Sequence, residues 1–240
     1  DDQGDQYLDM LGGFGVAAIG RNKPVVGAAL RDVLDMDLPN MVQMDCALLS
    51  GLLAEALVQR TPPHLDAVYF CNSGTESVEA SLKFARAATG RDRFVHFRGG
   101  WHGLTMGSLS VMGGDEFREG FGHLLPGDEV EPGDLEHVER LLAREDVAAV
   151  IVECVPGHSV KLPPDGFLAR VQQLCRDHGT LLICDEVATG YGRTGTMFAF
   201  EHFGLEPDII ATSKALSGGY VPVAATICRR QVYQAVFSSM

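Results

Sequence analysis

Short apolar segments alternate with longer segments of helical periodicity through most of this 240-residue chain. After residue 63 we expect strands at 67–71, 93–97, 147–152, 181–185, 209–212 and 223–227, and helices at 76–89, 134–144 and 166–178. Because the apolar runs do not alternate with polar residues, both faces of each strand are expected to be buried. The pattern predicts an α/β fold whose mainly parallel sheet is flanked by helices.

The first 60 residues follow a different pattern. Residues 1–20 mix glycine with apolar residues and are expected to form a short hairpin or an extended arm, and helices are expected at 24–36 and 45–60. We interpret the leucine stripe of the second helix as core packing; it consists of Leu48, Leu49, Leu52, Leu53 and Leu57. The chain is therefore divided into an N-terminal arm with helices, residues 1–60, and a large domain, residues 61–240.

Composition excludes several classes of function. The net charge of -13 disfavours nucleic acid and anionic membranes as partners, because binding phosphate groups needs clustered Lys and Arg. No apolar stretch approaches the roughly 20 residues of a membrane span. The histidines lack metal-ligand spacing, so no metal site is expected. The cysteines form no CxxC pair and indicate reduced core thiols in a cytoplasmic protein; they are Cys46, Cys71, Cys154, Cys175, Cys184 and Cys228.

Lys214 is the chemically most informative residue, because it follows a buried strand and stands among small residues. Burial lowers the pKa of an ammonium group, and the neutral amine is the form that makes Schiff bases. Taken alone, such a lysine more often reaches into solvent. Three further segments that follow predicted strands favour chemistry: 72–76, 100–103 and 184–187. Ligands of parallel sheets bind at the carboxyl ends of the strands, where these segments should meet.

The first segment contains Ser73, Gly74 and Thr75 between a strand and a helix. Small residues and hydroxyl groups at a helix N-terminus favour phosphate, because backbone amides can approach the anion closely. The alternative is ordinary helix capping by Ser or Thr with a Glu nearby. The segment has no Lys, which argues against a nucleotide P-loop.

The other two segments offer a flat ring and a carboxylate. Trp101 can stack on a planar ligand or pack in the core, and His102 can orient a ligand, move a proton or make a structural hydrogen bond. Asp185 can pair with a pyridinium nitrogen, and Val187 can pack on a ring. We interpret Glu186 as structural. An amine, a phosphate cradle, a stacking face and a carboxylate together match the needs of pyridoxal 5'-phosphate.

Four motifs occur in the order and spacing of class III pyridoxal-phosphate-dependent aminotransferases: 70–80, 185–187, 192–195 and 212–215. Segments 117–127 and 197–202 are most similar to the putrescine- and ornithine-type amine aminotransferases. The resemblance covers almost the whole chain. It implies the large domain of fold type I and a homodimer with shared active sites. It also implies amino-group transfer from an amine or ω-amino acid to a 2-oxo acid through pyridoxamine phosphate.

The resemblance also implies a role for each matching residue. Lys214 carries the cofactor as a Schiff base and moves a proton at the substrate carbon, and Asp185 holds the pyridine nitrogen. The remaining contacts are the phosphate ligands Ser73, Gly74 and Thr75 and the residues on the two ring faces, Trp101 and Val187.

Some positions depart from the family pattern. Ala188 stands where the family usually has Gln, and the segment from Glu153 to His158 replaces a Glu-Pro-apolar-Gln-Gly-Glu pattern. His158 thus indicates altered substrate handling, and Glu153 and His158 are candidate substrate residues. Arg21 stands where the family often has His. The family's small C-terminal domain would lie beyond Met240, so we expect the chain to be truncated before it.

Three functions compete. The first is amino-group transfer by Lys214 and Asp185. The second keeps the cofactor but is a decarboxylase, mutase or racemase reaction, favoured by Ala188 and the rewritten 153–158 segment. The third is a non-catalytic paralogue or structural subunit. Composition does not choose between a diamine and an amino acid as the donor.

Overall fold

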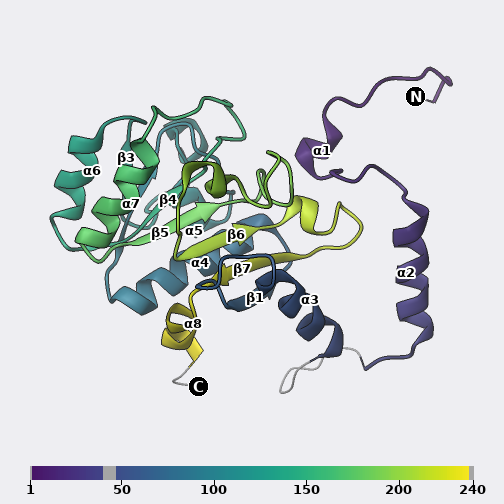
Figure 1. Cartoon of the computed structure of the whole chain (residues 1–240). Coiled ribbons are helices and arrows are strands. Elements are labelled where there is room, and N and C mark those ends of the chain that lie inside the picture. Colours follow the sequence, from purple (N-terminus) through teal and green to yellow (C-terminus); the bar gives the residue numbers. More distant parts are fainter. Residues whose placement is uncertain (1, 40–46, 238–240) are drawn as a thin grey trace.

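The computed structural model describes residues 2–39 and 47–237, in which a seven-stranded sheet has helices on both faces (Figure 1). The strands are β1 Ala67–Cys71, β2 Arg93–Phe97, β3 Gly127–Val130, β4 Val147–Val152, β5 Leu181–Asp185, β6 Ile209–Thr212 and β7 Ala224–Cys228. Their order across the sheet is β1-β7-β6-β5-β4-β2-β3. Only β7 runs antiparallel to its neighbours within the described residues, so the predicted mainly parallel α/β sheet is confirmed.

Helices cover the two faces of the sheet with separate apolar layers. The helices are α1 Gly12–Gly15, α2 Pro24–Asp35, α3 Leu48–Val58, α4 Gly74–Thr89, α5 Met106–Ser110, α6 Leu135–Leu142, α7 Phe167–Asp177 and α8 Arg230–Phe237. One layer joins Val78 of α4 and Val232 of α8 to the sheet at Ile151. The other joins α6 and α7 to the opposite face, with Leu141 and Leu174 packed in the same cluster.

The predicted strands correspond closely to the observed ones, whereas the strand β3 and the helix α5 were not predicted. β7 begins and ends one residue later than expected. The edge strand β3 carries Asp128 and Glu129 and therefore has no apolar run to reveal it. The five-residue helix α5 is too short for its periodicity to be recognised.

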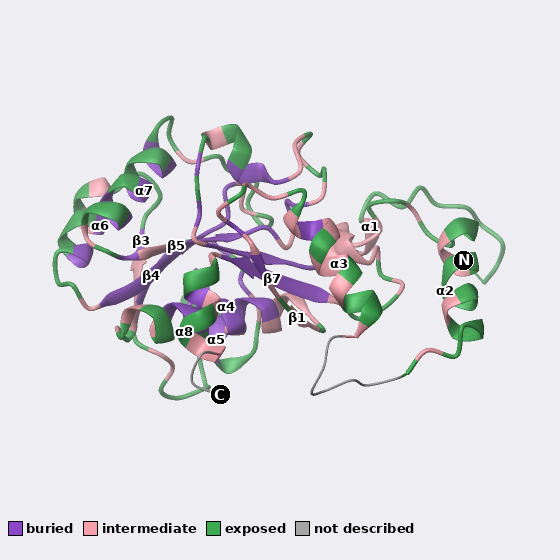
Figure 2. Cartoon of the chain, turned by 60° about the horizontal axis from the view of Figure 1, so that its bottom comes forward, coloured by how far each residue is buried: buried purple, intermediate pink, exposed green. Residues whose placement is uncertain are grey.

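The N-terminal region confirms the first helix and the extended-arm alternative, and it corrects the expectation for the leucine stripe. Residues 2–20 form no hairpin; they are an extended arm with the short segment α1, and α2 lies away from the sheet (Figures 1 and 2). The leucine stripe does not pack wholly into the core, because α3 contacts β1 mainly through Leu53 and Leu57. Leu48 is 62% exposed and Leu52 is 53% exposed.

Several simple expectations can be checked against the described residues. Cys71, Cys154, Cys175, Cys184 and Cys228 are free thiols, whereas Cys46 lies outside the described residues. No helix in the described ranges is long and apolar enough to cross a membrane.

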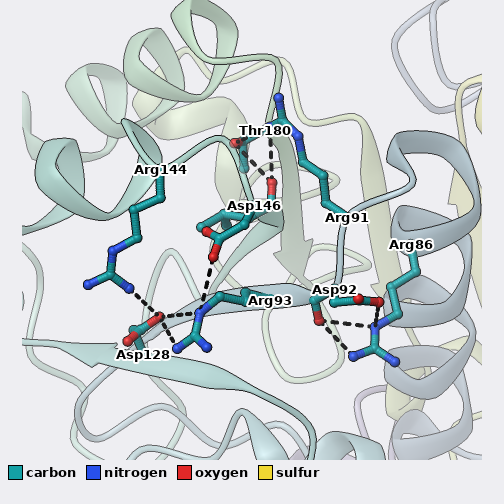
Figure 3. A network of polar contacts seen from close by, with 9 residues as sticks. Arg86, Arg91, Asp92, Arg93, Asp128, Arg144, Asp146 and Thr180 are labelled. Atoms are coloured by element: carbon teal, nitrogen blue, oxygen red, sulfur yellow. Dashed lines mark hydrogen bonds and ion pairs between the residues drawn. The ribbon is translucent and has the colours of Figure 1, made fainter.

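A polar network ties the amino ends of the strands together, at the edge opposite the strand ends singled out above (Figure 3). Arg93 at the start of β2 pairs with Asp128 of β3 at 2.8 Å and with Asp146, just before β4, at 3.8 Å. The Arg91 guanidinium donates to the carbonyl of Gly179 and to the hydroxyl of Thr180 before β5. These arginines are already engaged by the fold, so this edge has a structural role.

Candidate active site

The candidate site lies at the carboxyl ends of β1, β2, β4, β5 and β6, as expected for a ligand site of such a sheet. β1 runs in the same direction as β6, because each is antiparallel to β7. The segments that follow these strands carry the predicted residues Ser73–Thr75, Trp101–His102, Glu153, Asp185 and Lys214.

A buried ion pair joins the ends of β2 and β5. His102 Nδ1 lies 2.8 Å from Asp185 Oδ2, and the two side chains are 1% and 3% exposed. Burial by itself would lower the pKa of His102, but the hydrogen bond and the charges of Asp185 and Glu153 raise it overall. The other oxygen of Asp185 accepts from the backbone N–H of Val187 at 3.0 Å. Asp185 is thus held as an oriented carboxylate by two donors.

Glu153 holds the backbone around this ion pair. Its two oxygens accept from the N–H of Trp101 at 2.7 Å and from the N–H of Gly157 at 3.0 Å. Burial raises the pKa of Glu153, although the charge of His102 opposes this shift. In the described structure Glu153 therefore organises two loops. A Cβ added at Gly157 would lie 3.3 Å from the Cβ of Ala188, so the rewritten 153–158 segment is a neighbour of the Ala188 departure.

The segment from Ser73 to Thr75 begins α4 as predicted, and it has features of both a helix cap and a phosphate site. Ser73 is the N-cap residue and accepts from the N–H of Glu76, whose carboxylate accepts from the Ser73 hydroxyl at 2.8 Å. This is the capping arrangement that the sequence left open as an alternative. A Cβ at Gly74 would lie only 2.8 Å from Val187 Cγ1, so glycine is required for β5 and α4 to approach this closely.

Lys214 begins a short 3₁₀ turn directly after β6, at Lys214–Leu216. Its φ of 36° falls in the left-handed region, which is strained for a residue with a side chain. Among the described residues its ammonium group has no ion pair and no hydrogen-bond acceptor. The preceding Ser213 places its Cβ 3.5 Å from the Cβ position of Gly74, so the lysine turn adjoins the start of α4.

The remaining predicted residues differ in how closely they approach the residues placed so far at this sheet edge. Trp101 is 38% exposed and packs edge-on against Phe117, with ring centroids 5.1 Å apart. His158 is exposed, and no described contact brings it to the residues above. Glu186 is buried and accepts from Thr189 and from two backbone N–H groups, which fits the structural role expected for it. Burial raises the pKa of Glu186.

Sequence reasoning missed two hydroxyl side chains that contact the predicted Thr75 and a carboxylate that binds one of them. Thr105 and Ser108 place their hydroxyl groups against Thr75, and Glu79 binds Thr105. The only signal in the sequence was the richness in hydroxyl residues after His102, which does not reveal a contact across 33 residues.

Solved structures of known proteins share this fold. The ornithine aminotransferase from Toxoplasma gondii superposes with a TM-score of 0.91 at 29% identity, over 98% of this chain and 58% of that one. A thermostable (S)-enantioselective ω-transaminase from Thermomicrobium roseum gives a TM-score of 0.89 at 31% identity, over 98% and 59%. The described sheet and its helices therefore form the large domain of an aminotransferase.

Sequence relatives define the family. The acetylornithine aminotransferase of Methanopyrus kandleri is 46% identical over 98% of this chain and 60% of its own length. The aminotransferase PigE of a Serratia species is 42% identical over 94% of this chain and 27% of its own. The family described as aminotransferase class-III matches residues 1–239. This chain belongs to the class-III aminotransferase family, and it spans 60% or less of these two curated relatives.

Proposed function

We propose that this protein transfers an amino group from an amine or ω-amino acid to a 2-oxo acid, with pyridoxal 5'-phosphate as cofactor. The observation that carries the proposal is that the unpaired Lys214 adjoins the start of α4, at the same sheet edge as the oriented Asp185. Relatives of this chain include an acetylornithine aminotransferase and an ornithine aminotransferase. They support the putrescine- or ornithine-type interpretation.

The residues present fit this cofactor. Residues 73–75 are partly exposed at the N-terminus of α4, where backbone N–H groups favour an anion, and Ser73 and Thr75 add hydroxyl groups for a phosphate. Val187 lies against Gly74, where it can pack on one face of the ring, and Trp101 is assigned to the other. When bound, the cofactor supplies an electron-withdrawing ring that stabilises negative charge at a substrate carbon.

The chain's own groups then have distinct tasks. Asp185 is oriented to face the pyridine nitrogen by the hydrogen bonds from His102 to Oδ2 and from the Val187 N–H to Oδ1, and the contact with Asp185 raises the pKa of His102. Lys214 Nζ is the amine that binds the cofactor and, when released, takes and returns a proton at the substrate carbon. Glu153 and His158 are assigned to substrate handling.

The domain division and the partner follow from the same proposal. Residues 61–240 form the cofactor-binding large domain, and residues 1–60 reach toward a second copy of the chain. The arm exposes large apolar side chains that a partner would cover, among them Tyr7, Leu8, Met10 and Phe14. A homodimer with shared active sites accounts for this surface.

Product analysis separates this function from its alternatives. The purified protein is incubated with pyridoxal phosphate, a diamine or ω-amino acid, and pyruvate or 2-oxoglutarate. Formation of alanine or glutamate supports amino transfer, and Lys214→Ala must abolish it. Carbon dioxide or an isomerised substrate without an amino acid product identifies a decarboxylase, racemase or mutase. Cofactor binding without turnover of any donor identifies a non-catalytic paralogue.

A further inference from the structure

Three hydroxyl groups and a carboxylate converge behind the first turn of α4; we call Thr75, Glu79, Thr105 and Ser108 the hydroxyl cluster. Thr75 Oγ1 lies 2.6 Å from Ser108 Oγ and 2.9 Å from Thr105 Oγ1. Thr105 donates its hydroxyl proton to Glu79 Oε1 at 2.5 Å. Ser108 is completely buried, whereas Thr75 is half-buried at the edge that carries the candidate site.

The number of protons in the hydroxyl cluster restricts which hydroxyl group can be the donor of each hydrogen bond. Each hydroxyl group has one proton, and that of Thr105 is taken by Glu79. Thr105 Oγ1 can therefore only accept from Thr75 or Ser108. The Ser108 hydroxyl has two further acceptors in reach, Thr75 Oγ1 at 2.6 Å and the carbonyl oxygen of Thr105 at 3.1 Å, and the shorter contact favours Thr75. With Ser108 donating to Thr75 Oγ1, the proton of Thr75 is free to point toward Thr105 or toward a ligand. A hydroxyl group that accepts one hydrogen bond is also polarised to donate a stronger one.

The backbone around the hydroxyl cluster leaves it little freedom. Glu79 Oε1 also accepts from the N–H groups of Gly107 and Ser108, at 2.7 and 3.1 Å, which joins α4 to α5. A Cβ at Gly103, whose φ is 115°, would overlap the Thr75 side chain. The turn after His102 is thus pressed directly onto Thr75, and the position of Ser108 relative to Thr75 is fixed by two elements.

We propose that Ser108 is a positioning residue for phosphate binding: it donates to Thr75 Oγ1 and so directs the Thr75 proton to an anion at the N-terminus of α4. Because Thr105 donates its only hydroxyl proton to Glu79, it does not compete with Ser108 as a donor to Thr75 Oγ1. This inference rests on the proposed function, in which Thr75 binds the phosphate of the cofactor. Ser108 itself touches no ligand and acts only through Thr75.

The test compares two cofactor forms that differ only in the phosphate group. Affinities of pyridoxal phosphate and of pyridoxal are measured by absorbance titration of the cofactor-free protein and of its Ser108→Ala variant. Loss of one such hydrogen bond should weaken pyridoxal phosphate binding by roughly two- to tenfold. Pyridoxal binding should stay unchanged. Ser81→Ala is the matched control, because the hydroxyl of this buried serine of α4 donates, within the described residues, to the carbonyl of Ser77 alone and should change neither affinity.

A double-mutant cycle tests whether Ser108 acts through Thr75. In a Thr75→Val background, Ser108→Ala should cause no further loss of pyridoxal phosphate affinity. Thr105→Val should weaken phosphate-dependent binding and Thr105→Ser should restore it, which keeps the test open if Ser108→Ala does not fold. An equal loss for both cofactor forms, or additive effects with Thr75→Val, would overturn the role of Ser108. Failure of the unmodified protein to bind either form at Lys214 would instead overturn the proposed function, and this inference with it.

Discussion

His96 gives the protein a defined acid sensitivity. The side chain is completely buried in β2, and within the described structure neither ring nitrogen has a hydrogen-bond partner. Burial lowers the pKa of His96 from 6.5 to about 3, with smaller contributions from the charges of His102 and Arg118. His96 therefore stays neutral in the folded protein, whereas the unfolded chain binds a proton below pH 6.5. The contribution of neutral His96 to the free energy of unfolding is therefore complete above pH 6.5 and is lost as the pH falls toward 3.

The size of the effect follows from these two values. Between pH 7.5 and 5 the unfolded state gains roughly 2 kcal/mol from protonation that the folded state cannot match, and about 4 kcal/mol is lost by pH 3. Since small domains are stable by about 5–15 kcal/mol, the loss is large. Replacing His96 by Leu removes the titrating group and also two buried polar atoms.

The assay is urea unfolding followed by circular dichroism at pH 7.5 and at pH 5. The unmodified protein should lose about 2 kcal/mol more than His96→Leu over this interval. The exposed His123→Leu serves as the control and should lose as much as the unmodified protein. Parallel pH curves for the unmodified protein and His96→Leu would refute the reasoning, because they would mean that His96 titrates alike in both states.

Three further substitutions probe other parts of the structure. Glu186→Ala leaves two buried backbone N–H groups without an acceptor and should lower the free energy of unfolding by roughly 3 kcal/mol, measured with urea; a loss below 1 kcal/mol would contradict its structural role. Gly74→Ala places a Cβ 2.8 Å from Val187 Cγ1 and should weaken pyridoxal phosphate binding about tenfold in a titration, with partial recovery in Gly74→Ala/Val187→Ala; unchanged affinity would argue against a tight cradle. Leu48→Ser with Leu52→Ser should reduce dimer formation in sedimentation velocity while thermal stability of the monomer changes little, since both side chains are exposed; an unaffected dimer would remove α3 from the interface.

The sheet could be predicted because each central strand is buried on both faces and so appears as an uninterrupted apolar run. β3 could not, since it is mostly only partly buried and presents Asp128 and Glu129, so it has no apolar run. The leucine stripe of α3 shows a different limit. Helical periodicity indicates that a face is apolar, but it does not say what covers that face, and Leu48 is exposed.

The candidate site, too, could be predicted from the sequence only in part. That Asp185 and Lys214 lie at one sheet edge could be expected, because the carboxyl ends of parallel strands meet there. The partner of Asp185 could not, since His102 is 83 residues away and its direction is set by the turn after β2. Ser108 was invisible for the same reason. A buried hydroxyl group has no sequence pattern of its own, and its role arises only from the packing of α5 against α4.

Covalent trapping of the cofactor tests the central claim most directly. The protein is loaded with pyridoxal phosphate, reduced with borohydride, digested and analysed by peptide mass spectrometry, with Lys214→Ala and the exposed Lys161→Ala treated in parallel. The account predicts a phosphopyridoxyl group on Lys214 in the unmodified protein and in Lys161→Ala, and no site of comparable occupancy in Lys214→Ala. Modification spread over surface lysines, or equal in all three proteins, would contradict it.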